Sequence, residues 1–171
     1  MTWTEPATWY ANLASFYAAA AALITDPAGN VLLVKPTYRD SWSFPGGYVD
    51  EDEYPHDACA REVREELGVS VVVGKLLVVD WAPPSGRRPR SIISFTFDCG
   101  SIADLDSFNL PGQELEDVAF FPSHEAEQRL PDNVATRVHA AMRARDRHAP
   151  AYLAGGSAVQ PPSGDAASRE A

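Results

Sequence analysis

The stretch from residue 47 to residue 69 constrains this chain more than any other part of its sequence. It carries charged residues and glycines at seven fixed positions: Gly47, Glu53, Arg61, Glu62, Glu65, Glu66 and Gly68. At an average usage of about one in twenty for each residue type, seven such positions coincide by chance roughly once in 10⁹ starting points. A spacing this specific indicates a chemical site rather than an ordinary acidic surface.

The second half of this stretch predicts a helix over about residues 55–67. Pro55 stands where proline fits the first helical turn, and Gly68 stands where a left-handed residue can end the helix. An apolar stripe runs along one side and consists of Cys59, Val63 and Leu67. We therefore expect the helix to dock on a core through this stripe.

Three glutamates share another face of the predicted helix. Glu65 and Glu66 lie three and four residues after Glu62, which places the three carboxylates close together. Such carboxylates repel one another, and protonation or a bound divalent cation relieves the repulsion. Hard oxygen ligands favour Mg²⁺ or Mn²⁺, and Mg²⁺ commonly takes its remaining ligands from water and substrate phosphates. The sequence therefore predicts a Mg²⁺ or Mn²⁺ site and a substrate that carries phosphate.

The whole stretch resembles the signature box of the Nudix hydrolases and matches it at every fixed position. The resemblance covers about residues 15–147, and it implies an α+β fold in which a mixed β-sheet lies between helices as an α/β/α sandwich. It implies that the metal is held by the Gly47 carbonyl and by Glu62, Glu65 and Glu66. It also implies that Glu53 and Arg61 form an ion pair that holds the loop on the catalytic helix.

A glutamate beyond the box completes the site that the resemblance implies. Glu114 matches the region where many Nudix enzymes place a further catalytic or metal-binding glutamate, and Glu116 is its rival. Either Glu62 or Glu114 is then the base that removes a proton from the attacking water. The sequence leaves both possibilities open.

At two positions of the box, this sequence differs from the residues that are commonest in the family. Asp52 stands where family members often carry Gly, and Tyr54 stands where Ser or Thr often caps the helix. Because Tyr is a poor N-cap, we expect Asp52 or Glu53 to cap instead. These departures affect the shape of the loop and leave the predicted metal ligands unchanged.

The rest of the chain predicts several strands and a second helix. Two apolar runs, at residues 15–25 and 31–35, flank a turn signal and predict a hairpin. Further strands are expected at residues 69–73, 75–81, 91–99 and 116–121, and a helix at 131–147. Strands mixed with helices in this way predict a sheet covered by helices.

Length and composition predict one domain with extensions. The chain has 171 residues and is 45% hydrophobic. We expect an N-terminal extension over residues 1–14, a domain over 15–150 and a disordered tail over 151–171, where small and polar residues dominate. We also expect a cytoplasmic protein without membrane association, since no apolar run reaches 18 residues and no secretory signal is visible.

Charge and cysteine content narrow the partners. The formal net charge of −10 repels polyanions, so we expect a small nucleotide-type substrate and no extended nucleic-acid partner. Whether the chain forms a homodimer is left open by the sequence. The two cysteines show no metal-type spacing, and Cys59 is expected to be a buried free thiol.

Candidate substrate-binding residues lie on either side of the box. Tyr38, Arg39 and Trp42 precede it and could stack on a base or pair with phosphate. Arg87 and Arg88 belong to a loop after it and could clamp a phosphate.

Together with these residues, the resemblance implies a metal-dependent hydrolase that cleaves a diphosphate bond in a nucleoside diphosphate linked to another moiety, such as a nucleotide or sugar nucleotide. Two alternatives share the fold. One is a non-catalytic Nudix-like nucleotide sensor, which often loses box carboxylates, whereas this chain has them all. The other is an isopentenyl-diphosphate isomerase-like enzyme, which needs a catalytic cysteine outside the box.

Overall fold

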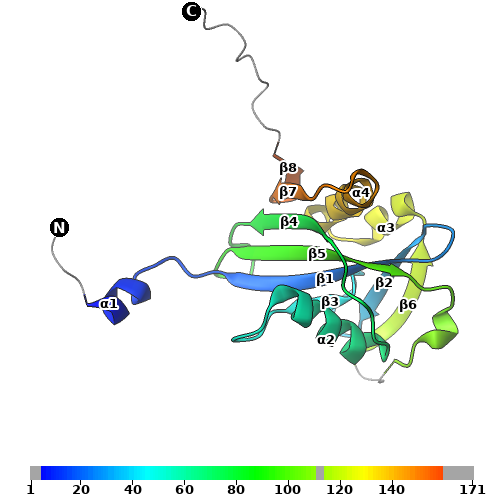
Figure 1. The fold of residues 1–171 in the computed structure, drawn as a ribbon, viewed down its shortest axis with the longest axis horizontal. Coiled ribbons are helices and arrows are strands. Elements are labelled where there is room, and N and C mark those ends of the chain that lie inside the picture. The colour runs from blue at the N-terminus through cyan, green and yellow to red at the C-terminus, as the bar shows by residue number, and fades with distance from the viewer. Residues whose placement is uncertain (1–4, 111–113, 160–171) are drawn as a thin grey trace, which may run out of the picture.

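A mixed eight-stranded sheet forms the centre of the structure, a computed structural model that describes residues 5–110 and 114–159 (Figure 1). The strands are β1 (Tyr17–Thr25), β2 (Val31–Pro36), β3 (Gly46–Tyr48), β4 (Leu76–Ala82), β5 (Ile92–Ser101), β6 (Leu115–Phe121), β7 (Ala151–Ala154) and β8 (Ser157–Ala158). The helices are α1 (Pro6–Ala11), α2 (Pro55–Leu67), α3 (Ser123–Arg129) and α4 (Asp132–Arg147), with a 3₁₀ turn η1 at Leu105–Ser107. The strand order is β6-β2-β1-β5-β4-β7-β8, and β3 pairs with β1 outside this path.

Helices cover both faces of the sheet, which confirms the predicted α+β sandwich. Figure 1 shows α2 on one face and α3 with α4 on the other. Alternation along β1 serves both layers, because Leu23 packs in the α3 and α4 core whereas Ala22 and Ile24 pack in the α2 core. Both layers are built on the parallel pair of β1 and β5, which runs through the middle of the sheet.

The predicted hairpin and the predicted helix after residue 130 are confirmed. β1 and β2 pair antiparallel across the turn, and α4 buries Val138 and Ala141 as expected. The strand expected at residues 69–73 is wrong, because this segment has no strand pairing. Val69, Val71 and Val73 nevertheless pack, partly buried, against the α2 core, whereas Val72 is exposed.

Polar contacts attach α4 to the sheet at two points. In the last turn of α4, Arg145 donates to both carboxylate oxygens of Asp98 at 3.1 and 2.6 Å and to the Leu23 carbonyl oxygen at 3.1 Å. Two turns earlier, Arg137 donates from Nε to Asp80 Oδ2 at 2.8 Å. Asp80 is fully buried on β4, so this ion pair lies inside the core.

The domain continues past residue 150, where the sequence analysis placed its end. β7 adds to β4 in parallel and β8 turns back on β7, so residues 151–158 extend the sheet and are not a disordered tail. The turn between them is fixed to the core, because the Gly156 N–H donates to Asp80 Oδ1 at 3.2 Å. Gly156 itself lies close to the start of α4, because a Cβ there would come within 3.0 Å of the Asn133 carbonyl oxygen. Residues 160–171 of the expected tail lie outside the described ranges.

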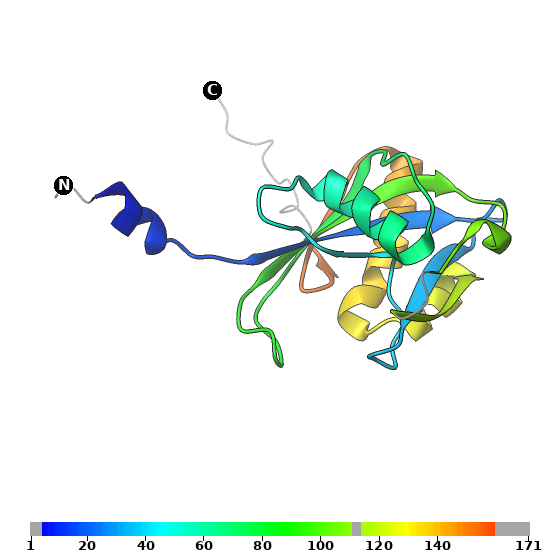
Figure 2. The same cartoon turned by 90° about the horizontal axis from the view of Figure 1, so that it is seen from below.

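The N-terminal extension separates from the sheet. Figures 1 and 2 both show α1 standing away from the domain at the end of an extended segment that leads into β1. Within the described ranges, no helix is long and apolar enough to cross a membrane.

Candidate active site

The two glycines of β3 lie directly against the carboxylates of α2. The Gly46 N–H donates to Glu66 Oε2 at 2.8 Å, which ties the C-terminal half of the helix to the strand. A Cβ atom at Gly47 would collide with the carboxylate of Glu62. The paired glycines therefore bring backbone and two box carboxylates into close approach. The Gly-Gly pair is the signal in the sequence for this close approach.

Gly46 is also required by the sheet itself. Its φ of +142° is unfavourable for residues with a side chain, and a Cβ there would collide with the Ala20 carbonyl oxygen. β3 pairs with β1 at this point, where Ala21 is the register partner of Gly46. Small residues on both strands thus allow β3 to lie close to β1 and present its backbone to α2.

Arg61 connects the box loop to the catalytic helix. Its guanidinium donates to both oxygens of Glu53 at 2.9 Å each and to the Tyr48 carbonyl oxygen at 3.0 Å. The same group donates to Glu62 Oε1 at 2.8 Å and to Glu65 Oε2 at 3.2 Å. The hydrogen bonds from Arg61 lower the pKa of Glu53 to about 2, and the bonds to Glu53 raise the pKa of Arg61. The structure therefore contains the ion pair that the resemblance implied.

The loop before α2 explains one departure from the box and corrects one expectation. Asp52 has a φ of +62°, a left-handed conformation that glycine adopts most easily, which accounts for the glycine common at this position. The N-cap residue is Tyr54, and no side chain caps the helix. Capping by Asp52 or Glu53 was therefore a wrong expectation. Glu53 is instead engaged by Arg61 and by the Asp50 N–H.

Burial raises the pKa of two box carboxyl groups. The pKa of Glu66 is raised to about 7; desolvation is the largest cause, and the charges of Glu62 and Glu114 act in the same direction. The hydrogen bond from Gly46 and the charge of Arg39 act in the opposite direction. Burial also raises the pKa of Glu62, despite its contact with Arg61. Partly buried carboxylates of this kind are typical of functional sites.

The donor set suits a hard divalent cation in its chemistry. Carboxylates at Glu62, Glu65 and Glu66 and a backbone carbonyl at Gly47 are oxygen ligands, the type that Mg²⁺ and Mn²⁺ take. A cation would also stabilise the ionised carboxylates of Glu62 and Glu66, whose pKa values are raised by burial. Within residues 5–110 and 114–159, however, no three His, Cys, Asp or Glu side chains already surround one metal position. Arg61 holds Glu62 and Glu65, while Gly46 holds Glu66.

The charges of two residues from outside the box act on Glu66. Glu114 and Arg39 both act on its pKa through their charges, so the fold brings these distant positions to the same end of α2. The Thr37 N–H donates to the Glu114 carbonyl oxygen at 2.9 Å, which aligns the start of β6 with the end of β2. Glu116, the rival of Glu114, instead pairs with Lys35 at 3.0 Å.

The remaining candidates for substrate binding lie in different surroundings. Tyr38 is 76% exposed, and the Arg39 guanidinium lies 5.7 Å from its ring centroid. Trp42 packs on the α3 and α4 face, where its ring contacts Phe121 at 4.9 Å between centroids. The structure therefore places Trp42 in the opposite core, away from the box carboxylates.

Arg87 and Arg88 lie in the loop between β4 and β5. Arg88 donates to the Pro83 and Arg90 carbonyl oxygens and is engaged in holding its own loop together. Arg87 is exposed. Neither residue is brought into contact with the box carboxylates by any hydrogen bond or ion pair that the described structure shows.

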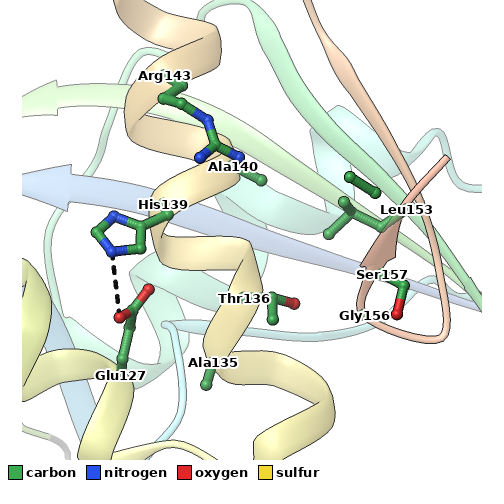
Figure 3. A pocket seen from close by; sticks show the side chains of 10 residues that line it. Glu127, Ala135, Thr136, His139, Ala140, Arg143, Leu153, Gly156 and Ser157 are labelled. Atoms are coloured by element: carbon green, nitrogen blue, oxygen red, sulfur yellow. Dashed lines mark ion pairs between the residues drawn. The ribbon is translucent and has the colours of Figure 1, made fainter. Parts of the chain in front are cut away.

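A hollow of about 540 Å³ lies on the other face of the sheet, between α4 and the turn after β7 (Figure 3). His139 points toward Glu127 and pairs with it at 3.3 Å, and Leu153 and Ser157 line the opposite side. None of its lining residues belongs to the box. The hollow is therefore separate from the carboxylate site.

Replacing Gly47 by alanine tests the close approach of β3 to α2. The added methyl group has to displace the Glu62 carboxylate, so we expect turnover to fall about 10²-fold, as small misplacements of reacting groups do. Gly29→Ala, in the turn between β1 and β2, is the control, because a Cβ there meets nothing within 4 Å; its φ of +86° strains alanine, and a thermal melt accounts for that cost. Steady-state kinetics of both variants checks this, and equal activities would contradict the proposed geometry.

Comparison with known proteins identifies the family. The NUDIX domain family model matches residues 16–143. The mRNA-decapping enzyme subunit 2 of Saccharomyces cerevisiae is 48% identical over 48 residues, which are 28% of this chain and 5% of that protein. An RNA pyrophosphohydrolase of Pseudomonas putida is 43% identical over 47 residues, which are 28% of this chain and 30% of that protein. The chain thus covers less than a third of either relative.

Solved structures share the fold over most of the chain. The MutT protein from Methanosarcina mazei Go1 has a TM-score of 0.65 and 24% identity, covering 77% of this chain and 96% of that one. The ORF135 protein of E. coli has a TM-score of 0.62 and 26% identity, covering 78% and 94%. Since the family model covers most of the chain and the box is complete, this protein is a member of the Nudix family.

Proposed function

We propose that this protein is a metal-dependent hydrolase that cleaves the diphosphate bridge of a small nucleotide-type substrate by attack of water on phosphorus. The observation that carries the proposal is the position of Glu66. Its carboxyl group is partly buried, is held by the Gly46 N–H, and is influenced by the charges of Glu62, Glu114 and Arg39. An acidic site of this kind binds a polyanionic substrate only when a cation neutralises it.

The metal ligands in this proposal are the Gly47 carbonyl and the carboxylates of Glu62, Glu65 and Glu66. When bound, Mg²⁺ or Mn²⁺ neutralises charge on the phosphates and makes water a better nucleophile. Arg61 orients Glu62 and Glu65 through its hydrogen bonds and keeps the loop of Glu53 against the helix. The chain's contribution is therefore a rigid set of oxygen ligands aligned by one guanidinium.

Two carboxylates are candidates for the base. Glu62 is partly buried and its pKa is raised by burial, which is suitable for accepting a proton. Glu114 stands just before β6, where its carbonyl oxygen accepts from the Thr37 N–H, and its charge acts on Glu66. We propose that one of them removes the proton from water, and that Arg39 and Tyr38 contact the substrate next to Glu66.

The substrate proposal follows from charge and from the relatives. Two relatives are named mRNA-decapping enzyme and RNA pyrophosphohydrolase. The second name describes cleavage of a pyrophosphate bond, which supports a diphosphate bridge as the bond that is cleaved. A formal charge of −10 disfavours a long polyanion, so we propose a small nucleotide or sugar nucleotide. A screen of nucleoside triphosphates, ADP-ribose, sugar nucleotides and 5′-triphosphorylated RNA with Mg²⁺, reading phosphate products, tests this. Hydrolysis of the RNA alone would overturn the proposed substrate size.

The isomerase-like alternative loses support in the structure. It needs a catalytic cysteine outside the box, and Cys99 is the cysteine in question. Cys99 is buried, and its sulfur lies 3.8 Å from that of Cys59 on α2. The hydrogen bond between the two thiols and burial raise the pKa of Cys59. The two cysteines therefore pack in the core between α2 and β5.

Neutralising Glu66 tests the metal site separately from turnover. We expect Glu66→Gln to weaken Mg²⁺ or Mn²⁺ binding by at least about tenfold, the range that even an outer-shell change costs a metal site. Calorimetric titration of the metal measures this without any substrate. Glu116→Gln removes an equal charge outside the site and should leave affinity unchanged. Unchanged affinity in Glu66→Gln would refute its assignment as a ligand.

A further inference from the structure

We call residues 5–16 the N-terminal arm, and this segment is not buried against the rest of the domain. Every residue in it is exposed, and Figures 1 and 2 show it extending away from the sheet in both views. Its contact with the domain is at its base, where the Phe16 ring lies 5.1 Å from that of Trp81. The described domain therefore offers this segment no surface on which to bury its side chains beyond Phe16.

The arm is nevertheless a defined element. The Glu5 carboxylate accepts from the Thr8 N–H at 3.0 Å at the start of α1, and Asn12 donates from its side chain to the Thr8 carbonyl oxygen at 2.7 Å at its end. Isolated helices this short are not stable in water, even when capped. The local sequence therefore encodes a helix whose stability has to come from a contact outside the domain.

Large apolar side chains are concentrated on this arm. Within eight residues it exposes Trp9 (51%), Tyr10 (66%), Leu13 (49%) and Phe16 (49%). The Trp9 and Tyr10 rings contact each other edge to face at 5.0 Å and form a compact aromatic surface. Aromatic residues of this kind are enriched where protein interfaces are buried.

The charge of the arm indicates the partner. The arm carries one charged residue, Glu5, in a chain whose formal net charge is −10. Two copies of so acidic a chain repel each other over most of their surfaces, and this segment is a place where they can meet without repulsion. The absence of Lys and Arg from the arm disfavours an anionic membrane surface, which basic interfacial helices prefer.

We propose that the N-terminal arm is a homodimer contact, in which the aromatic surface of one copy packs against the same surface of a second copy. A two-fold contact of this kind is self-complementary, so one patch suffices. Half-exposed aromatic and leucine side chains bury about 100 Å² each, and the eight contributed by two arms bury about 800 Å². With the backbone included, this comes to about 1,000 Å², the size of a weak, reversible interface and not of a permanent one, so we expect a dimer with a dissociation constant in roughly the micromolar range.

The base of the arm connects this contact to the box loop. Tyr17, the first residue of β1, contacts the Tyr48 ring at 6.1 Å, and the Tyr48 carbonyl oxygen accepts from Arg61. The dimer contact therefore begins beside the loop that Arg61 holds. The proposal does not depend on hydrolysis and can be tested without a substrate.

Sedimentation velocity of the full chain over a concentration series tests the proposal. We expect wild type to show a monomer–dimer equilibrium and the variant Trp9→Ala with Tyr10→Ala to be at least about tenfold weaker, as expected for central aromatic residues of an interface. Leu13→Asp, which places a charge in the apolar contact, should act in the same direction. Leu105→Ala removes an exposed apolar side chain at the opposite end of the sheet and should leave the equilibrium unchanged.

Three outcomes would overturn the proposal. One is a wild-type protein that stays monomeric up to roughly 100 µM, well above the range expected of a specific interface. The second is a dimer that both arm variants leave unaffected. The third is a monomeric wild type that co-sediments with phosphatidylcholine vesicles while the Trp9→Ala, Tyr10→Ala variant does not, which would make the arm a membrane contact. Because the arm lies outside the core, circular dichroism should show the same fold in all variants.

Discussion

Glu62→Gln is expected to reduce turnover by about 10²–10⁴-fold while the protein stays folded, since general-base help alone is worth that much. The substitution keeps the size and hydrogen-bonding shape of the side chain but removes the charge needed to bind a metal or accept a proton. Glu62 lies against Gly47, contacts Arg61 at 2.8 Å and is partly buried, so its charge acts inside the site.

Turnover on the substrate that the screen identifies, together with a thermal melt, measures this effect. Glu125→Gln is a matched control, because Glu125 lies on α3 on the opposite face of the sheet and pairs with Arg129. A folded Glu62→Gln protein that retained more than about a tenth of wild-type turnover would fall outside the range for a catalytic carboxylate and refute the role.

Asp80→Ala is expected to lower the free energy of unfolding by about 3–5 kcal/mol, the cost of leaving one member of a buried ion pair without its partner. Asp80 is fully buried and accepts from Arg137 Nε at 2.8 Å. It also accepts from the Gly156 N–H, so its loss leaves the turn between β7 and β8 unattached. One side chain thus secures both α4 and the end of the sheet.

Urea denaturation measures the difference. Glu116→Ala breaks the exposed pair with Lys35 and should cost less than about 1 kcal/mol. Adding Arg137→Met to Asp80→Ala should recover part of the loss, because an apolar side chain replaces the unpaired buried charge. A loss in Asp80→Ala no larger than that of the control would show that the pair does not stabilise the core.

Local sequence was sufficient for the elements whose signals are short in range. The box helix, its ends at Pro55 and Gly68, and the hairpin of β1 and β2 were all predicted, because capping residues, turn residues and apolar periodicity act within a few positions. The same rules failed at residues 69–73, where alternate valines (Val69, Val71 and Val73) are partly buried without strand pairing. Burial explains such a run as well as a strand does.

Contacts between distant residues could not be predicted in this way. The sequence analysis ended the domain at residue 150, because the segment beyond it is small and polar. The structure shows that β7 and β8 join the sheet, since β4 offers a free edge and Asp80 an acceptor for Gly156. Trp42 likewise looked available to a substrate, but the segment that bridges to β2 at Ser43 places it in the opposite core.

The sequence by itself determined the family, the helix that carries the acid groups, and the type of ligand that three neighbouring carboxylates favour. These follow from spacing along one helix, which is fixed by 3.6 residues per turn. Only the tertiary structure decided that Gly46 holds Glu66, that the charge of Glu114 acts on Glu66 while Glu116 pairs with Lys35, and that Arg61 donates hydrogen bonds to three carboxylates. Those contacts join separate strands, loops and helices, and their geometry arises only when both faces of the sheet pack.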